Sequence, residues 1–548
     1  MRATFPATWA RPQSGGHSAS AIAVAMLALL AAVPGAARPV AHRPIAAPDG
    51  PAASLFGPIA TTATSRAYLG NPAAYAAVGY VEEEYFLKGR ARVYDWVDGT
   101  PRVKVVAGPG DYVTRILVRR PQNARRFSGR AEVHILNAST SVDQGGFTDF
   151  ARMTQQGDAW IGITSKALTA RALQNFDPVR YAPLDWANPA PPAQRCQLPT
   201  IVPVYSVGGI EMMKLLAGMG MKGSPPETED GLVYDMITQL ARVLKSPAGR
   251  QILPGKGPPR LYLTGISQSA LMIRTWVTAF HDTARLAGGR PLYDGYLAVV
   301  GPAQLRLSQC GADVLPDDPR QKLARLDVPF ISLSSEGETW LSRYSWQPDQ
   351  IARRSGLVTY QIAGASHKRA EVPGLAPDLL RVAPPEDEAK AGFASPTGNA
   401  PSKLIPAGSS ANALPWAPVM RGAWANLVAW AEKGIRPPQA PTIALDAKLE
   451  IRRDAQGNAL GGLRMPDIEA PLASHRGAVS VGGPGAIFGI QTAFSSAVIR
   501  ALYPTDAAYV AKFSAATDRL LAQRFILRPD AAALKASART VSVKGGAD

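Results

Sequence analysis

The 548-residue sequence is poor in cysteine, in histidine and in charged side chains. It contains two cysteines and six histidines, and charged residues make up 18% of the chain against 46% hydrophobic residues. Such a low charged fraction excludes a disordered chain or a long coiled coil, whereas the hydrophobic fraction is sufficient for a large core. The sequence also contains no internal repeat, and no apolar run after residue 33 is long enough to cross a bilayer.

The basic residues show none of the patterns that mark nucleic-acid binding. The formal net charge is +17, which favours anionic partners in general. However, no zinc-finger or helix-turn-helix spacing appears, and no aromatic residues are interleaved with the cations. The basic residues occur as scattered pairs, such as Arg119-Arg120, Arg125-Arg126, Arg353-Arg354 and Arg452-Arg453. We therefore expect no nucleic-acid partner.

The first 37 residues predict a secretory signal peptide. Arg2 and Arg11 precede an apolar run from Ala19 to Val33, and small residues follow it up to Ala37, after which we expect cleavage. The apolar run is about 15 residues long, shorter than the roughly 20 that a membrane-spanning helix needs. The mature protein is thus expected to be secreted or periplasmic, without stable insertion in the membrane.

Export agrees with the cysteine content. An oxidising compartment allows one disulfide, between Cys196 and Cys310, which would close a long loop and contribute about 4 to 5 kcal/mol in the loop-entropy treatment. The alternative is a pair of buried thiols.

The hydrophobic pattern predicts one large α/β domain. Residues 38–75 are rich in Ala, Pro and Thr and are interpreted as a linker or irregular lead-in; residues 76–548 form the domain. Eight apolar or alternating runs predict strands: 81–97, 112–121, 130–140, 158–166, 260–264, 291–301, 327–338 and 356–367. The early strands are close enough for antiparallel hairpins, and the later ones are separated by crossovers long enough for helices.

Helices are expected near 209–218 and 231–245, after Ser267, and at 422–438 and 506–525. Residues 369–418 lack periodicity and predict an insertion that could act as a lid, and a C-terminal extension follows from residue 439. The run Glu82-Glu83-Glu84 lies in a strand, where the three side chains cannot share one face, so we expect a solvated edge and no metal site.

A serine occupies the turn between a strand and a helix. Residues 260–264 predict the strand, and Gly265-Ile266-Ser267-Gln268-Ser269-Ala270 predicts a sharp corner with Ser267 at its apex. A nucleophilic serine at such a corner needs small neighbours, because its backbone is strained and the helix packs closely on the strand. The alternative is an ordinary loop in which the serine caps the helix.

The remaining residues of a serine hydrolase occur in the required order. The nucleophile needs a histidine base, itself oriented by a carboxylate, and both follow later strands. His367 alone among the histidines follows the last predicted strand. Glu336 and Glu338 both lie in the loop expected to carry the acid. Many hydrolases have the pattern P-x-x-x-x-x-G-E-x-D there, and this resemblance, aligned on Pro329, implies Glu338, with Glu336 as the close rival.

The oxyanion hole would use backbone N–H groups at two loops. We expect one donor at Gln268, where the helix begins, and the second in the turn at Asn137.

Several longer segments resemble one family. They are EEEYFLKGRARVYDW (82–96), EVHILNAST, WIGITSK, GISQSA, SSEGE, IAGASH, WAEKGIRPP, GGLRMPDIEAPLASHRG (461–477) and LYPTDAAYVAKF (502–513). In this order they resemble the alpha/beta-hydrolase superfamily and, within it, bacterial and often secreted proteins described only as alpha/beta hydrolase domain proteins. The resemblance implies an eight-stranded, mostly parallel sheet flanked by helices and a Ser, acid, His hydrolase. Two departures are Ser269-Ala270 after the serine and Glu338 where aspartate is usual.

These observations predict a carboxylic-ester hydrolase that forms an acyl-enzyme on Ser267 and acts on small-molecule or polymeric esters. No metal or organic cofactor is expected, since neither a His/Cys ligand cluster nor a dinucleotide-binding glycine motif follows a strand. A peptidase or amidase with the same triad is one alternative. Another is an inactive protein of this fold that binds an anionic envelope polymer. The sequence does not define the oligomeric state.

Overall fold

The structure is a computed structural model. It describes residues 53–139, 141–146, 150–196, 224–315, 318–323, 325–343, 356–368, 380–381, 384–392, 405–479 and 488–543. The expected signal peptide, the expected helix at 209–218 and much of the expected insertion at 369–418 lie outside these residues.

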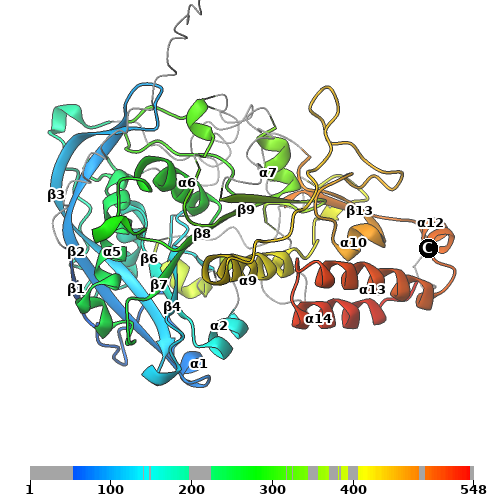
Figure 1. The fold of residues 1–548 in the computed structure, drawn as a ribbon, viewed down its shortest axis with the longest axis horizontal. Coiled ribbons are helices and arrows are strands. Elements are labelled where there is room, and N and C mark those ends of the chain that lie inside the picture. The colour runs from blue at the N-terminus through cyan, green and yellow to red at the C-terminus, as the bar shows by residue number, and fades with distance from the viewer. Residues whose placement is uncertain are drawn as a thin grey trace, which may run out of the picture. The chain divides into compact units, whose positions relative to one another are not determined.

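A nine-stranded sheet forms the centre of the described structure (Figure 1), in the order β1-β2-β3-β6-β4-β7-β8-β9-β10. The pairs β1–β2, β2–β3 and β3–β6 are antiparallel. Every pair from β6 onward in this order is parallel. Their bounds are β1 (Ser54–Phe56), β2 (Tyr80–Trp96), β3 (Val103–Pro121), β4 (Arg130–Ile135), β6 (Ala159–Ile163), β7 (Arg260–Ile266), β8 (Gly295–Val299), β9 (Phe330–Ser335) and β10 (Leu357–Ile362).

The predicted alpha/beta-hydrolase fold is confirmed, with two corrections. All eight predicted strands are present, but β1 adds a ninth within the stretch predicted to be irregular. In addition, β4 and β6 are parallel and do not form a hairpin. The reason is α2 (Phe150–Gln156), which lies between them and lets the chain cross back to the same end of the sheet.

Side chains alternate between the two faces of the sheet and bury both. Leu261 and Leu263 of β7 pack with α5 (Val233–Lys245) and α6 (Gln268–Phe280) in one core. Tyr262, between the two leucines, packs in a second core that includes α9 (Ala417–Lys433), α13 (Asp506–Ala522) and α14 (Arg528–Arg539). Figure 1 shows α9 running along this second face. Strands buried on both faces explain why their sequences are almost continuously apolar.

The expected helices are largely confirmed where the structure describes them. The helix expected at 422–438 is α9, which begins earlier because Pro418 suits its first turn and ends at Gly434, whose φ of 68° is left-handed. The helix expected at 506–525 is α13.

Shorter elements complete the described structure. The remaining helices are α1 (Pro72–Ala76), α3 (Ala167–Phe176), α7 (Glu336–Leu341), α8 (Pro385–Lys390), α10 (Pro466–Glu469) and α12 (Ser496–Leu502). Two small sheets pair β5 (Gly145–Gly146) with β11 (Leu380–Arg381), and β12 (Ser410–Ala411) and β13 (Ala473–Arg476) with β14 (Ile490–Ala493). Single 3-10 turns span Ala124–Arg126, Pro192–Gln194, Asp230–Leu232, Pro247–Gln251, Ala287–Gly289 and Pro319–Gln321.

The expectation of a solvated edge at Glu82-Glu83-Glu84 is wrong. β1 pairs with residues 86–88 of β2, and the Ile59 N–H donates to the Glu84 carbonyl at 2.7 Å, so β2 is not a solvated edge strand here. The Glu84 carboxylate is buried and pairs with Arg115 and Arg180, each at 2.5 Å. Glu82 on the same face pairs with Arg119 at 2.7 Å, whereas Glu83 on the other face is half-buried and pairs with Arg120 at 2.8 Å.

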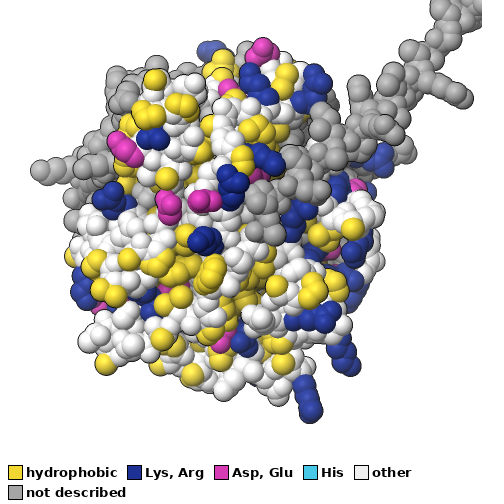
Figure 2. All heavy atoms as spheres, turned by 90° about the vertical axis from the view of Figure 1, so that its left-hand side faces the viewer, with side chains coloured by type: hydrophobic (Ala, Val, Ile, Leu, Met, Phe, Trp, Pro, Cys, Tyr) yellow, Lys and Arg dark blue, Asp and Glu magenta, His cyan; other side chains and the backbone are white. Residues whose placement is uncertain are grey.

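Cys196 and Cys310 form the expected disulfide, with their Cα atoms 5.4 Å apart. None of the helices in the described ranges is long and apolar enough to cross a membrane. On the face that carries β2 and β3, Lys and Arg side chains are spread among uncharged ones (Figure 2).

Candidate active site

Ser267 stands at a strained corner between β7 and α6. Its φ of 59° and ψ of −123° are rare for a residue with a side chain. The corner is held by the Ser267 N–H, which donates to the Val299 carbonyl at 2.8 Å. Such strain at the end of a central parallel strand exposes the hydroxyl at the carboxyl edge of the sheet.

Close contacts between the strand and the helix explain why the residues around this corner are small. A Cβ on Gly265 would lie 2.8 Å from the Ser269 carbonyl carbon, and one on Gly301 would lie 2.6 Å from the Ala270 Cβ. Ser269 is accommodated because its Oγ donates to the Ile266 carbonyl at 2.8 Å and accepts from the Ile266 N–H at 3.1 Å. The departure at Ser269-Ala270 is therefore compatible with the turn, and glycine is required at Gly265 and Gly301 instead.

The imidazole of His367 contacts Ser267. Its Nε2 lies 2.9 Å from the Ser267 Oγ, and His367 follows the last parallel strand, β10, as Ser267 follows β7. The two residues are 100 positions apart in the chain. The side chain of His367 is 25% exposed, so the imidazole is open to solvent on one side.

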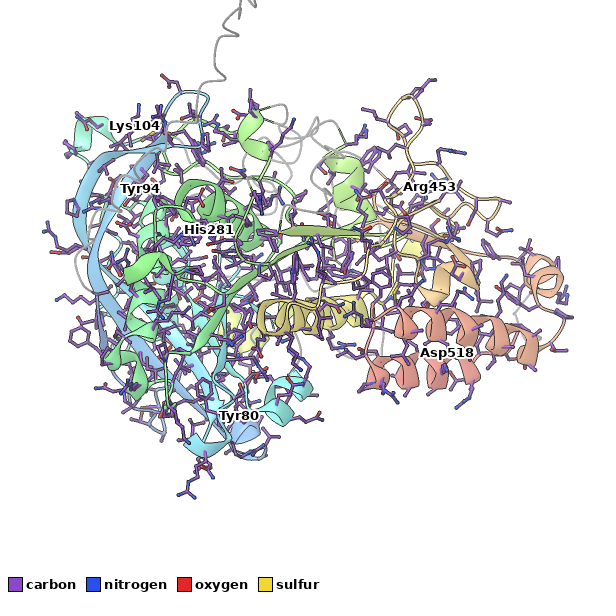
Figure 3. All side chains as sticks on the ribbon, in the orientation of Figure 1. Tyr80, Tyr94, Lys104, His281, Arg453 and Asp518 are labelled. Carbon is purple, nitrogen blue, oxygen red and sulfur yellow. A yellow bond between two sulfur atoms is a disulfide. The ribbon has the colours of Figure 1, made fainter. Side chains whose placement is uncertain are left out.

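Other described histidines have structural partners. His134 bonds to Thr264 within the sheet at 2.9 Å. His281, at the far end of α6 (Figure 3), contacts the Tyr296 hydroxyl and the Asp327 carboxylate, both at 2.7 Å. His475 contacts Asn412 at 3.0 Å. His367 is therefore the histidine that the described structure brings to Ser267.

Glu338 contacts the other nitrogen of the imidazole. Its Oε1 lies 2.5 Å from His367 Nδ1, and its Oε2 accepts from the Ser335 N–H at 2.9 Å. Burial raises the pKa of a carboxyl, but the neighbouring His367 imidazole and the bonds from Ser335 hold the pKa of Glu338 below its ordinary value. Glu338 is thus a carboxylate at neutral pH, and the imidazole donates its Nδ1–H to it.

Glu336, the rival acid, has a different set of partners. Its Oε2 accepts from the Gly364 N–H at 2.7 Å, and its Oε1 accepts from Arg453 at 2.8 Å and from the Gly477 N–H at 3.1 Å. Both carboxylate oxygens are therefore engaged away from Ser267. The prediction that left Glu336 as a possible orienting acid is corrected in favour of Glu338.

One of the two expected oxyanion donors is well placed and the other is not. Gln268 is the first residue of α6, so its backbone N–H lies at the positive end of the helix dipole. Asn137 uses its donors elsewhere: its backbone N–H donates to Gln144 O at 3.0 Å and its Nδ2 to Ile266 O at 2.7 Å. The prediction of Asn137 as second donor is corrected to a structural role, tying the loop after β4 to the corner at Ser267.

The geometry permits proton transfer from the Ser267 hydroxyl to His367 with Glu338 behind it, an arrangement that activates a serine as a nucleophile. Within the described residues, no three His, Cys, Asp or Glu side chains are grouped so as to hold a metal ion.

Comparison with known proteins defines the family. A family model described as "Alpha/beta hydrolase domain" matches residues 55–536. The chain therefore belongs to the alpha/beta hydrolase domain family. No curated protein matches the sequence.

Several solved esterases are similar in structure. Aspergillus niger EstA is 11% identical over 35% of this chain and 28% of its own, with a TM-score of 0.18. The methylesterase BT1017 is 10% identical over 57% of this chain and 54% of its own, with a TM-score of 0.21. The esterase Est22 is 11% identical over 53% of this chain and 74% of its own, with a TM-score of 0.26. The chain thus spans less than two thirds of the first two of these proteins. The assignment to the family depends on the match of residues 55–536.

Four residues around the His367 loop were not predicted from the sequence: Asn412, Arg453, His475 and Gly477. Three of them, Arg453, His475 and Gly477, belong to the C-terminal extension. The only signal was the segment 461–477, whose resemblance to the family carried no role for its residues.

Proposed function

We propose that the protein is an exported serine hydrolase that cleaves carboxylic esters through Ser267, His367 and Glu338. The observation that carries the proposal is the continuous contact from the Ser267 Oγ to His367 Nε2 at 2.9 Å and from His367 Nδ1 to Glu338 Oε1 at 2.5 Å. A hydroxyl, an imidazole and a buried carboxylate in this order make serine nucleophilic at neutral pH.

The reaction has two halves. The Ser267 Oγ attacks the acyl carbon while His367 Nε2 takes its proton, and Glu338 stabilises the imidazolium that results. The oxyanion accepts a bond from the Gln268 backbone N–H, at the positive end of α6, and from a second donor on the loop after β4. The imidazolium then protonates the departing alcohol. In the second half, His367 deprotonates a water molecule, which attacks the acyl carbon of the acyl-enzyme. The imidazolium then returns this proton to the Ser267 Oγ as the bond to the acyl group breaks, which releases the acid and regenerates Ser267 and the neutral His367.

Export is part of the proposal because the expected signal peptide precedes the domain and because Cys196 and Cys310 are joined. A disulfide of this kind persists in an oxidising compartment. The proposed substrates are small-molecule or polymeric esters outside the cytoplasm.

Hydrolysis of short-chain nitrophenyl esters tests the proposal. Ser267→Ala should lower kcat by at least about 10³-fold, because the remaining groups cannot form an acyl-enzyme. Ser495→Ala is a matched control, since Ser495 also precedes a helix and its hydroxyl accepts from the Val498 N–H at 3.4 Å. Undiminished turnover in Ser267→Ala would refute the proposal, and a preference for matched anilides over esters would redefine it as an amidase.

A further inference from the structure

We propose that the C-terminal extension positions the general base, through an ion pair between Arg453 and Glu336 that holds the backbone beside His367. The inference rests on the proposed function for its consequence in catalysis. Glu336 and Arg453 are positioning residues in this account, because neither touches the reacting atoms.

Glu336 connects three segments that are distant in the sequence. It is the first residue of α7, and its carboxylate accepts from the Gly364 N–H, three residues before His367, at 2.7 Å. The other oxygen accepts from Arg453 at 2.8 Å and from the Gly477 N–H at 3.1 Å. Figure 3 shows Arg453 on the loops of the extension, beside α7. The base loop and the extension are therefore joined by one carboxylate.

Burial makes this connection stiff. The Glu336 side chain is 0% exposed and that of Arg453 is 21% exposed. A buried carboxylate needs both a counter-charge and hydrogen bonds to offset its lost hydration, so its partners have little freedom to move away. Removal of Arg453 would leave the charge of Glu336 with backbone N–H groups alone, and the Gly364 segment would have to adjust.

A second set of bonds holds the opposite side of the same loop. Gly364 has a φ of 73°, and its carbonyl accepts from the Asn412 Nδ2 at 2.6 Å. The Asn412 Oδ1 in turn accepts from the Leu414 N–H at 3.1 Å and contacts His475 Nδ1 at 3.0 Å. These contacts require the Asn412 amide to present its oxygen to Leu414, which makes His475 Nδ1 the protonated nitrogen. Gly364 is thus held at both its N–H and its carbonyl.

The extension also packs directly against the loop. A Cβ on Gly477 would lie 2.2 Å from the Ala365 carbonyl oxygen and 2.6 Å from the Gly337 nitrogen. Two residues before Ala365, the Ala363 N–H donates to the Leu463 carbonyl at 3.0 Å. These contacts hold the backbone from Ala363 to Ala365. Because His367 follows only two residues later, its backbone has little freedom to move the imidazole away from Ser267. The extension therefore fixes the orientation of the imidazole.

Three arginine variants of the full chain test the role of the ion pair. Arg453→Met should lower kcat about 10- to 100-fold with little change in KM, since a base displaced by a fraction of an ångström loses rate and not ground-state binding. Arg453→Lys should restore most of the activity because it restores the cation. Arg464→Met is the matched control: Arg464 lies in the same extension, has an equally exposed side chain at 21%, and pairs with Asp454 and Glu469. It should retain kcat within about twofold.

A double-mutant cycle separates positioning from general destabilisation. If Arg453 acts through the imidazole and its carboxylate, Arg453→Met should have a much smaller effect in a Glu338→Gln background, where orientation is already lost. Fully additive effects, or an equal loss of activity in Arg464→Met, would overturn the proposal.

Hydrogen exchange of the peptide covering residues 357–368 tests the connection without any substrate. Exchange should be faster in Arg453→Met than in the wild type or in Arg464→Met, at a temperature where all three are folded. Unchanged exchange would overturn the proposal. If exchange responds but the wild type shows no Ser267-dependent hydrolysis, the positioning contact stands and the proposed function alone fails.

Discussion

Ser267, His367 and Glu338 are held by three different devices. Ser267 is fixed by backbone strain at the end of β7, with a φ of 59°. His367 is fixed by the bonds of its own loop, and Glu338 by a reciprocal cap in which Ser335 Oγ accepts from the Glu338 N–H while the carboxylate accepts from the Ser335 N–H. The acid is therefore coupled to the stability of α7, unlike a carboxylate on a free loop.

Glu338→Gln should lower kcat for ester hydrolysis by about 10²- to 10⁴-fold with KM little changed. The amide can present a donor to His367 Nδ1 and favour the wrong tautomer of the imidazole. Steady-state kinetics on nitrophenyl esters measure the effect. Glu450→Gln, which alters a half-exposed carboxylate bonded to Trp340, should remain close to wild type. Equal activity of the two variants would contradict the role of Glu338.

His475 should make the protein less stable in acid. Burial lowers the pKa of His475 from 6.5 to about 4, so the folded chain binds this proton less readily than the unfolded chain. The contribution of His475 is complete above pH 6.5 and declines as the pH falls toward 4, by up to about 3 kcal/mol.

Urea unfolding near pH 7 and near pH 4.5 should therefore show a smaller loss of stability in His475→Gln than in the wild type. The glutamine keeps a side-chain N–H for Asn412 but does not titrate. Identical losses in both proteins would rule out His475 as the source.

The candidate site could be predicted only in part from single residues. The position of His367 after the last strand and the corner at Ser267 follow from chain order, which the sequence carries directly. The choice between Glu336 and Glu338 does not follow from chain order. Two residues apart at the start of α7, they point about 200° apart around the helix, so the register of one helix turn decides which meets the imidazole. Asn137 was misassigned because its hydrogen bonds depend on Ile266 and Gln144, which no local pattern reveals.

The antiparallel pair of β2 and β3 carries a buried ion network that periodicity cannot predict. Alternation places Glu82 and Glu84 on one face correctly, but whether that face meets water depends on Arg180 and Tyr181, which contact Glu84 from far away in the sequence. Strand positions follow from local period-two patterns; the neighbours of a strand follow from the whole chain.

Glu84→Gln should lower the free energy of unfolding by about 3 to 5 kcal/mol. The substitution leaves Arg115, whose side chain is 0% exposed, and Arg180, at 2%, without their shared carboxylate. Equilibrium unfolding in urea measures the change.

Glu83→Gln is the natural control on the same strand. Its side chain is 23% exposed and its pair with Arg120 is half-buried, so the expected cost is about 1 kcal/mol or less. Similar costs for the two variants would show that the buried network contributes no more than a surface pair.

Two contacts join parts of the chain that are distant in the sequence. The C-terminal extension reaches the base loop through Arg453, and the disulfide joins the loops that hold Cys196 and Cys310. The family match from residue 55 to residue 536 includes both. The sequence predicted the disulfide from compartment and number alone, whereas the contact of the extension with the base loop could not be read from any local pattern.

Cys196→Ala/Cys310→Ala should destabilise the protein by roughly 4 to 5 kcal/mol, because the bridge closes a loop of 114 residues and restricts the unfolded chain. Thermal unfolding of the oxidised protein and of the double variant measures the loss. Addition of a reductant should shift the wild type to the midpoint of the variant and leave the variant unchanged. A variant as stable as the oxidised wild type would show that the bridge does not restrain the unfolded chain.

The most direct test of the account is the site at which a serine-directed phosphonate becomes attached. Peptide mapping by mass spectrometry should find one adduct per chain, on Ser267, forming more slowly in Glu338→Gln and not at all in Ser267→Ala. An unmodified protein, or an adduct on a different serine while Ser267→Ala still hydrolyses esters, would contradict the assignment of Ser267 as the nucleophile.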